Sequence, residues 1–176
     1  MNKRFFTIWT VLLIAILATS PVAAGGAVRL NGVAFRLGSL IADGYVSGIG
    51  STDVTVELKA SGDAAITCTN YGGNDVPGQS YPKVSASGFQ SLPGDSKLRK
   101  NGKAPFNNVE TQDPATVAWD VAGCPNSNWT GHIDFIFWTN ANISVYSTST
   151  GGLLKSQNYA CTTTRNPDSV SCVAVP

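Results

Sequence analysis

The chain contains few charged side chains and a single histidine, and it has no long hydrophobic run after its first two dozen residues. Charged residues make up 13% of the sequence, and the formal net charge is +1. Nucleic-acid and anionic-lipid binding need clustered Lys and Arg in excess, so the composition excludes nucleic acid as a partner. The only basic cluster lies among Gly, Pro and Asn residues and is interpreted as a solvated loop. Its members are Lys97, Arg99, Lys100 and Lys103.

The first 24 residues have the pattern of a secretory signal peptide. Lys3 and Arg4 form a short basic start, and a nearly unbroken apolar stretch follows from Phe5 to Ala18. That stretch is shorter than the roughly 20 residues of a membrane-spanning helix, and small residues precede Gly25. We therefore predict cleavage after Ala24, no membrane insertion after cleavage, and a secreted or extracytoplasmic protein of the cell envelope. Residues 25–176 are predicted to form a single domain of nearly neutral charge.

The sequence favours strands over helices, because apolar residues alternate with polar ones and no long stretch has helical spacing. The clearest predicted strands are 53–60 and 64–70, interpreted as a hairpin around the turn-forming residues 61–63. Two further predicted strands are 116–121, with Trp119 in the core, and 131–138, with Phe135 and Phe137 in the core. The remaining candidates are 28–37, 40–47, 83–89, 142–147, 153–161 and 169–175.

Short strands separated by Gly, Pro and Asn turns are typical of an antiparallel sandwich or barrel. We predict an all-β fold, an antiparallel β-sandwich of the immunoglobulin-like class. A helix, if one is present, is expected to be a turn or two near residues 96–100.

The four cysteines, Cys68, Cys124, Cys161 and Cys172, are expected to form two disulfides, since their number is even and the chain is predicted to be exported. Four cysteines allow three pairings. We favour Cys161–Cys172, because the residues between them have turn chemistry and would return the chain to a neighbouring strand. This choice leaves Cys68–Cys124. The absence of a Cys-x-x-Cys pair and the single histidine argue against a zinc site, so no metal or other cofactor is predicted.

The Gly-rich segment 71–79 is the most unusual stretch of the sequence. Its glycines and prolines favour a long turn. An anion-binding nest, or a calcium site at Asn74 and Asp75, is the less favoured alternative, because the downstream residues that each would require are missing.

Several segments resemble a group of small secreted bacterial proteins that are uncharacterised. The most specific segment is Cys-Thr-Asn-Tyr-Gly-Gly-Asn at 68–74 followed by Pro-Gly-Gln at 77–79; the likeness also covers 48–50, 53–58, 124–126 and Trp129. This resemblance implies export from a bacterium and an immunoglobulin-like β fold. It assigns no catalytic residues, because the group has no established activity.

No combination of residues predicts an enzyme. His132 lies in a predicted strand on the face opposite Phe135 and Phe137, where it would be exposed to solvent. Glu57 and Glu110 are the only glutamates, and Glu57 alternates like an ordinary exposed strand residue. We therefore predict a non-catalytic binding or structural module. A secreted hydrolase of an extracellular polymer is the alternative.

Aromatic residues in the C-terminal half provide the predicted binding surface. Trp138 and Tyr146 are out of phase with the predicted core residues of their strands, so both are expected on the outer face of a sheet. There they would contact a glycan or an extracellular protein. The alternative is that each ring covers an edge or packs under a loop.

Overall fold

The computed structural model describes residues 27–95, 97, 99–100, 102–166 and 168–176. The predicted signal peptide lies outside the described residues. So do Ser96 and Leu98 of the segment for which a short helix was considered; within that segment, Lys100 forms a β-bridge with Lys103. The elements are β1 (Arg29–Arg36), β2 (Ile41–Ser47), β3 (Val54–Asn70), β4 (Asp75–Pro77), β5 (Lys83–Leu92), β6 (Lys103–Glu110), β7 (Thr116–Val117), α1 (Trp119–Ala122), β8 (Trp129–Ser147), β9 (Leu153–Thr164) and β10 (Ser169–Val175).

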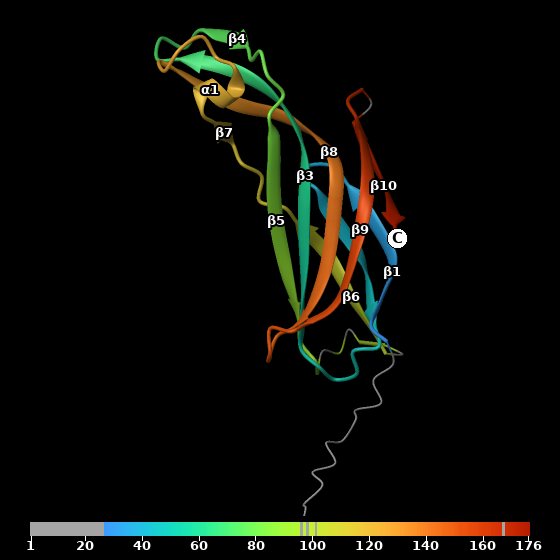
Figure 1. The fold of residues 1–176 in the computed structure, drawn as a ribbon. Helices are drawn as coiled ribbons and strands as arrows, with labels where there is room; N and C mark the ends of the chain where they lie inside the picture. Colours follow the sequence, from blue (N-terminus) through green and yellow to red (C-terminus); the bar gives the residue numbers. More distant parts are fainter. Residues whose placement is uncertain (1–26, 96, 98, 101, 167) are drawn as a thin grey trace, which may run out of the picture.

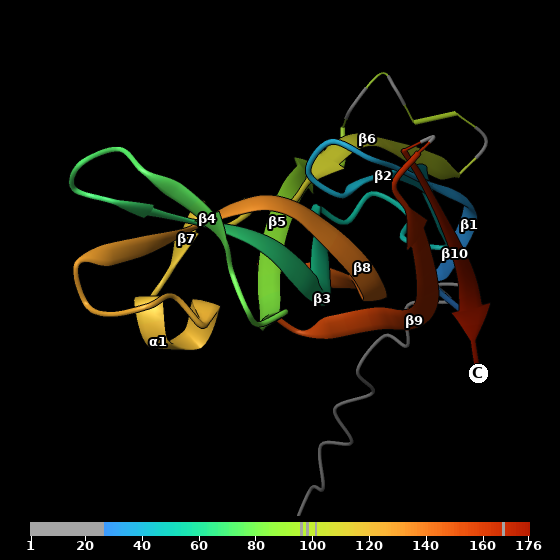
Figure 2. The ribbon, with the colours of Figure 1, turned by 90° about the horizontal axis from the view of Figure 1, so that it is seen from above.

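Two antiparallel sheets face each other and give a sandwich-like, all-β fold (Figure 1). The smaller sheet has the order β1-β2-β6. The larger sheet has the order β10-β9-β8-β3-β4, and β5 and β7 pair with β3 and β8 respectively. The predicted all-β antiparallel class is confirmed. Seen from above, β4, β7 and α1 project to one side of the two sheets (Figure 2).

The predicted hairpin at residues 53–70 is wrong, because this segment forms one strand of 17 residues, β3. Every even-numbered residue from Val54 to Cys68 is buried, so the alternation never changes phase. Gly62 was interpreted as a turn residue but lies in the middle of the strand. A Cβ atom there would lie 2.9 Å from the Cα of Trp138, so glycine permits close approach of the neighbouring strand.

The neighbouring strand β8 has 19 residues and contains two β-bulges. Its pairing with β3 shifts register at Asp134 and again at Thr139, which are the two additional residues. Each bulge changes which face the following residues occupy. Ile136 and Trp138 are consequently buried, whereas Phe135 and Phe137 face outward and are half-buried. The prediction that Phe135 and Phe137 lie in the core is therefore wrong.

The core lies between the sheets and is built from aliphatic residues of β2, β3, β6 and β8 together with two large aromatic rings. The largest fully buried side chains are those of Trp138, Phe106, Leu40, Leu58 and Ile143. Trp138 is only 1% exposed, so its predicted position on the outer face of the sheet is wrong.

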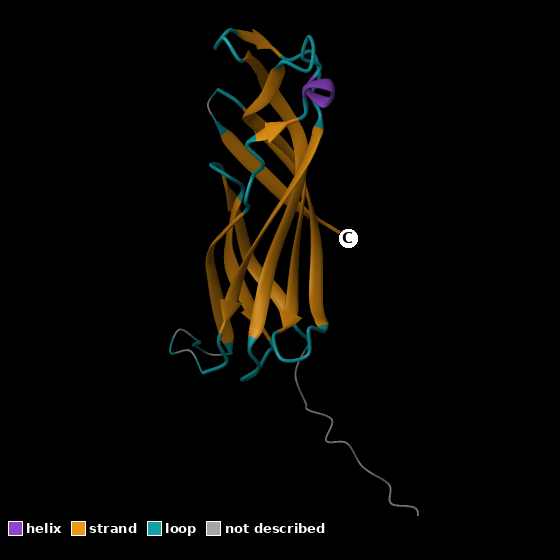
Figure 3. Ribbon diagram, turned by 90° about the vertical axis from the view of Figure 1, so that its left-hand side faces the viewer, coloured by secondary structure: helices purple, strands orange, loops and turns teal. Residues whose placement is uncertain are grey.

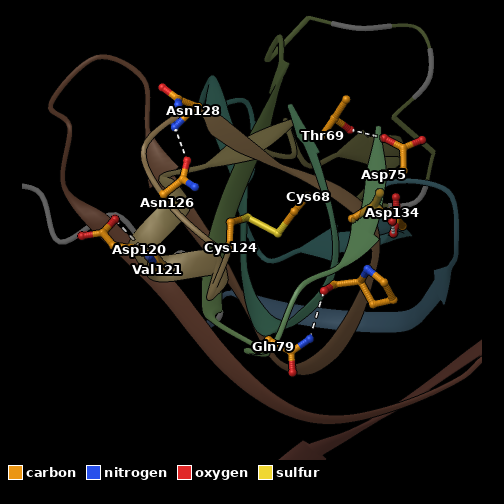
Figure 4. The surroundings of a disulfide bond; sticks show 12 residues. Cys68, Thr69, Asp75, Gln79, Asp120, Val121, Cys124, Asn126, Asn128 and Asp134 are labelled. Carbon is orange, nitrogen blue, oxygen red and sulfur yellow. Dashed lines mark hydrogen bonds between the residues drawn. A yellow bond between two sulfur atoms is a disulfide. The ribbon is translucent and has the colours of Figure 1, made fainter. Parts of the chain in front are cut away.

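The ends of β3 and β8 extend beyond the smaller sheet, and together with β4, β7 and α1 they form what we call the tip (Figure 3). Here the short helix α1 replaces the smaller sheet as the cover of the inner face. Ala122 packs on Gly131, where a Cβ atom would lie 2.6 Å from the Ala122 Cβ. The Cys68–Cys124 disulfide fastens the segment after α1 to β3, with a Cα–Cα distance of 5.7 Å (Figure 4).

The segment predicted as a strand at 116–121 changes structure at Ala118. Only Thr116 and Val117 pair with β8, and α1 follows directly. Trp119 is 39% exposed rather than in the core. The helix ends at Gly123, which adopts a left-handed conformation with φ of 68°.

Both predicted disulfides are confirmed. Cys161–Cys172 joins β9 and β10 at directly paired positions. Two disulfides are typical of an oxidising, extracytoplasmic environment. Within the described part of the chain, no helix is long and apolar enough to cross a membrane.

The basic segment is only partly a solvated loop. Lys97, Lys100 and Lys103 are exposed, but the Arg99 guanidinium donates to three backbone carbonyls. The acceptors are the carbonyls of Gly50 at 2.6 Å, Thr52 at 2.8 Å and Leu92 at 3.1 Å. Arg99 therefore joins the β2–β3 connection to the end of β5.

Candidate binding face

The side of the larger sheet that points away from β1, β2 and β6 is called the outward face. Its residues alternate with the buried residues of β3, β5, β8 and β9. The pairing register aligns them into rows across the sheet. One row contains Ser87, Lys59, Asn142 and Asn158, and the next contains Ser85, Ser61, Asn140 and Ala160. The middle of the outward face is therefore rich in hydroxyl and amide groups.

Asn142 and Asn158 form a hydrogen-bond network with Ser144 and Ser156 of the adjacent row, between β8 and β9. Asn142 Nδ2 donates to Ser156 Oγ at 2.8 Å and to Asn158 Oδ1 at 2.7 Å. Ser144 Oγ donates to Asn142 Oδ1 at 2.7 Å and lies 3.0 Å from Ser156 Oγ. Because each amide is held by its neighbours, the orientation of the donors and acceptors is fixed before any ligand arrives.

A pocket of about 790 Å³ lies at the same two rows. Its exposed polar lining residues are Lys59, Ser85, Ser87, Gln112, Asn140 and Asn158. Its buried lining residues include Ala60, Ala86, Ala141 and Tyr159. The volume falls within the range of small-ligand sites.

The charges near the pocket are paired with each other. Lys59 Nζ lies 3.0 Å from Glu57 Oε2 on the same strand. The hydrogen bond and the charge of Glu57 raise the pKa of Lys59. Two rows from Lys59 along β3, Lys83 Nζ lies 3.1 Å from Asp63 Oδ1. In these two pairs on the outward face the positive charge of each lysine is therefore balanced by a carboxylate.

Two aromatic residues border the polar rows on the outward face. Phe89 on β5 is 73% exposed and pairs with Glu57, one row from Lys59. Tyr146 on β8 is half-buried and pairs with Thr55, one row farther along. The predicted outward position of Tyr146 therefore agrees with the structure, whereas Trp138 lies on the opposite side, in the core. Phe89 was missed, although its alternation with Val84, Ala86 and Gly88 was a usable signal.

A second pair of rings lies nearer the tip. Phe135 and Phe137 meet edge to face, with ring centroids 4.9 Å apart. The Arg165 guanidinium lies 5.5 Å from the centroid of Phe135. Because these rings already have partners within the chain, they are a weaker candidate for a ligand surface than Phe89.

Tyr159 is the one buried aromatic residue at the pocket. Burial raises the pKa of its phenol. Its ring packs edge to face against Phe35 of β1 with centroids 5.0 Å apart, which connects the two sheets. Tyr159 therefore supports the pocket wall from the core side.

The residues considered for catalysis are not brought together at this pocket. His132 is exposed near the tip and pairs with Thr67, while Glu57 is held by Lys59. Among the described residues lining the pocket, none is acidic and none is histidine. All four cysteines are in disulfides.

The Gly-rich segment 71–79 has a structural explanation. Asn70 Oδ1 accepts hydrogen bonds from the backbone amides of Gly72 at 2.9 Å and Asn74 at 3.0 Å, which closes the β3–β4 turn. Thr69 Oγ1 donates to the Asp75 carboxylate at 2.6 Å. Gly78 lies against Ile66, where a Cβ atom would come within 2.9 Å of the Ile66 Cβ. The favoured interpretation as a long turn agrees with residues 71–74, whereas residues 75–77 form β4 and pair with β3.

A comparison of the chain with protein-family models, curated proteins and solved structures found no match. The resemblance to small secreted bacterial proteins therefore stays a prediction.

Proposed function

We propose that the chain is an exported, non-catalytic binding module of the bacterial cell envelope that holds its partner on the outward face of the larger sheet. The observation that carries this proposal is the combination of exposed Phe89 and half-buried Tyr146 with a preorganised polar pocket across β5, β3, β8 and β9. Binding modules need a stable scaffold and a surface with few mobile groups, and the two disulfides and the polar network provide both.

The immunoglobulin-like class belongs to the same proposal, supported by the two facing antiparallel sheets. Export is supported by the sequence of residues 1–24 and by the two disulfides.

Co-sedimentation with insoluble bacterial envelope material tests the proposal. The wild type is compared with a Phe89→Ala/Tyr146→Ala double variant, and we expect the apparent Kd to rise at least tenfold, as truncating aromatic anchors does. Trp119→Ala is the matched control, because Trp119 is also exposed but lies on α1 in the tip. It should leave binding unchanged.

Two results would contradict the proposal. Equal binding by the wild type and the double variant would show that the outward face is not the site. Time-dependent release of soluble fragments from the envelope material would favour the alternative of a secreted hydrolase.

A further inference from the structure

We infer that the outward-face pocket takes a neutral, hydroxyl-rich polymer, that is, an uncharged glycan segment; this inference rests on the proposed function and specifies the ligand of the same site. Four features carry it: the charge balance of the face, the type of its polar groups, the placement of its aromatic rings and the spacing of those rings.

The charge balance disfavours a charged ligand. Lys59 lies 3.0 Å from Glu57, and Lys83 lies 3.1 Å from Asp63, so each cation near the pocket already has its carboxylate. A polyanion would meet the two carboxylates as well as the two lysines, and a polycation would meet the two lysines as well as the two carboxylates, so neither gains from a field of one sign. A neutral ligand leaves both pairs in place.

The polar groups suit hydroxyls. An amide side chain both donates and accepts, and a serine hydroxyl does the same, so Asn and Ser complement the hydroxyls of a sugar in either role. Exposed Ser85, Ser87, Asn140 and Asn158 line the pocket. Asn158 Oδ1 is fixed by its 2.7 Å bond from Asn142, which leaves its own amide hydrogens available to a ligand.

The placement of the rings is the reverse of what a protein partner favours. Protein–protein interfaces have an apolar, often aromatic centre and a polar rim, and serine is depleted from them. Here serines and asparagines occupy the centre, and Phe89 and Tyr146 lie beyond them along the sheet. Polar groups that bind hydroxyls beside rings that stack on apolar sugar faces are typical of glycan recognition.

The spacing of the rings suits an extended chain. Phe89 and Tyr146 lie on opposite sides of β3 and one row apart, so their Cα atoms are separated by about 12 Å from strand and residue spacings. A polymer crossing β3 would contact both rings and lie beside the polar rows. A single monosaccharide would reach only one ring, which predicts a preference for oligomers.

Isothermal titration with defined glycans tests this inference. The probes are a neutral β-glucan oligosaccharide and a neutral galactomannan, with alginate as a polyanion of similar length. We expect a neutral glycan to bind with a Kd that changes less than threefold between 0.05 and 0.5 M NaCl, since uncharged contacts are not screened. Alginate should not bind, and the glucose monomer should bind at least tenfold more weakly than the oligosaccharide.

Two variants locate the site. Asn158→Ala should raise the Kd for the neutral glycan at least tenfold while leaving the melting temperature within about 2 °C of the wild type. Asn128→Ala is the matched control, because Asn128 is an exposed asparagine just before β8 in the tip. It should have no effect on binding.

The outcomes separate this inference from the function on which it rests. If neither neutral glycan binds but envelope binding still depends on Phe89 and Tyr146, the partner is not a neutral glycan and the proposed function stands. Alginate binding that weakens as the salt concentration rises would overturn the inference of a neutral ligand and leave the proposed function standing. If envelope binding is also independent of the two rings, both proposals fail.

Discussion

Replacing Trp138 with alanine is expected to destabilise the protein strongly, because the ring fills the core rather than the outward face. The side chain is 1% exposed, and the backbone around it is held on both sides. Gly62 allows β3 to approach it closely, and Thr163 Oγ1 donates to the Trp138 carbonyl at 3.0 Å. The surrounding strands therefore have little freedom to collapse into the space that the ring would leave.

The expected loss follows from the size of the ring. Truncation of a buried Trp or Phe to alanine costs about 3–5 kcal/mol, which is a large part of the roughly 5–15 kcal/mol stability of a typical domain. For a domain of this size, each kcal/mol lowers the melting temperature by about 2–4 °C, so a decrease of about 10 °C is expected.

Urea unfolding followed by far-ultraviolet circular dichroism measures the effect. Phe89→Ala is the control, because its ring is 73% exposed, and its change should stay within about 0.5 kcal/mol. A loss below about 1 kcal/mol in Trp138→Ala would refute the reasoning. That result would mean that Trp138 contributes no more to the core than a surface ring.

Two further predictions concern polar contacts at the ends of the sandwich. Arg99→Ala should lower the free energy of unfolding by about 1–2 kcal/mol, because three carbonyls lose a charged donor. The control Lys97→Ala, at an exposed position, should change it by less than about 0.5 kcal/mol. Equal effects of the two substitutions in chemical denaturation would contradict the structural role of Arg99. Burial alone would raise the pKa of Asp43, but hydrogen bonds from the Asn108 amide and from Arg36, and the charge of Arg36, lower it below the ordinary 3.8. The ionised carboxylate therefore adds stability above pH 3.8 that is lost as the pH falls through the lower folded-state pKa. Asp43→Asn should accordingly cost at most about 1 kcal/mol at pH 7 and nothing in strong acid, and a cost independent of pH would count against this ionisation.

Strand content, antiparallel class and disulfide pairing could all be predicted from the sequence. The alternation of β3 is regular over its whole length, and the turn residues between Cys161 and Cys172 indicate that their strands are adjacent. These features depend on local patterns, which a single sequence carries. The error at Gly62 arose because glycine serves both turns and close strand contacts, and only the neighbouring strand distinguishes the two.

The candidate binding face was only partly predictable, because the alternation of inward and outward residues along β8 shifts by one position at each of its two bulges. A period-of-two pattern started at Ile133 places Trp138 outward, and nothing in the local sequence marks the bulges at Asp134 and Thr139. Tyr146 was placed outward because its position was judged from the segment beyond both bulges. The pocket could not be predicted, since it depends on which residues of four strands share a row, and register is a long-range property.

The two bulges also determine the direction in which the tip points. β8 has 19 residues and β3 has 17 over their paired length. The longer strand therefore follows the outer side of a curve, and the two-stranded ribbon bends toward β3. The direction of the tip is thus encoded in a difference of chain length and not in side-chain chemistry. Substitutions can alter what the tip displays without moving it, whereas loss of one residue near Thr139 would remove one of the two bulges, reduce the bend and redirect everything beyond it.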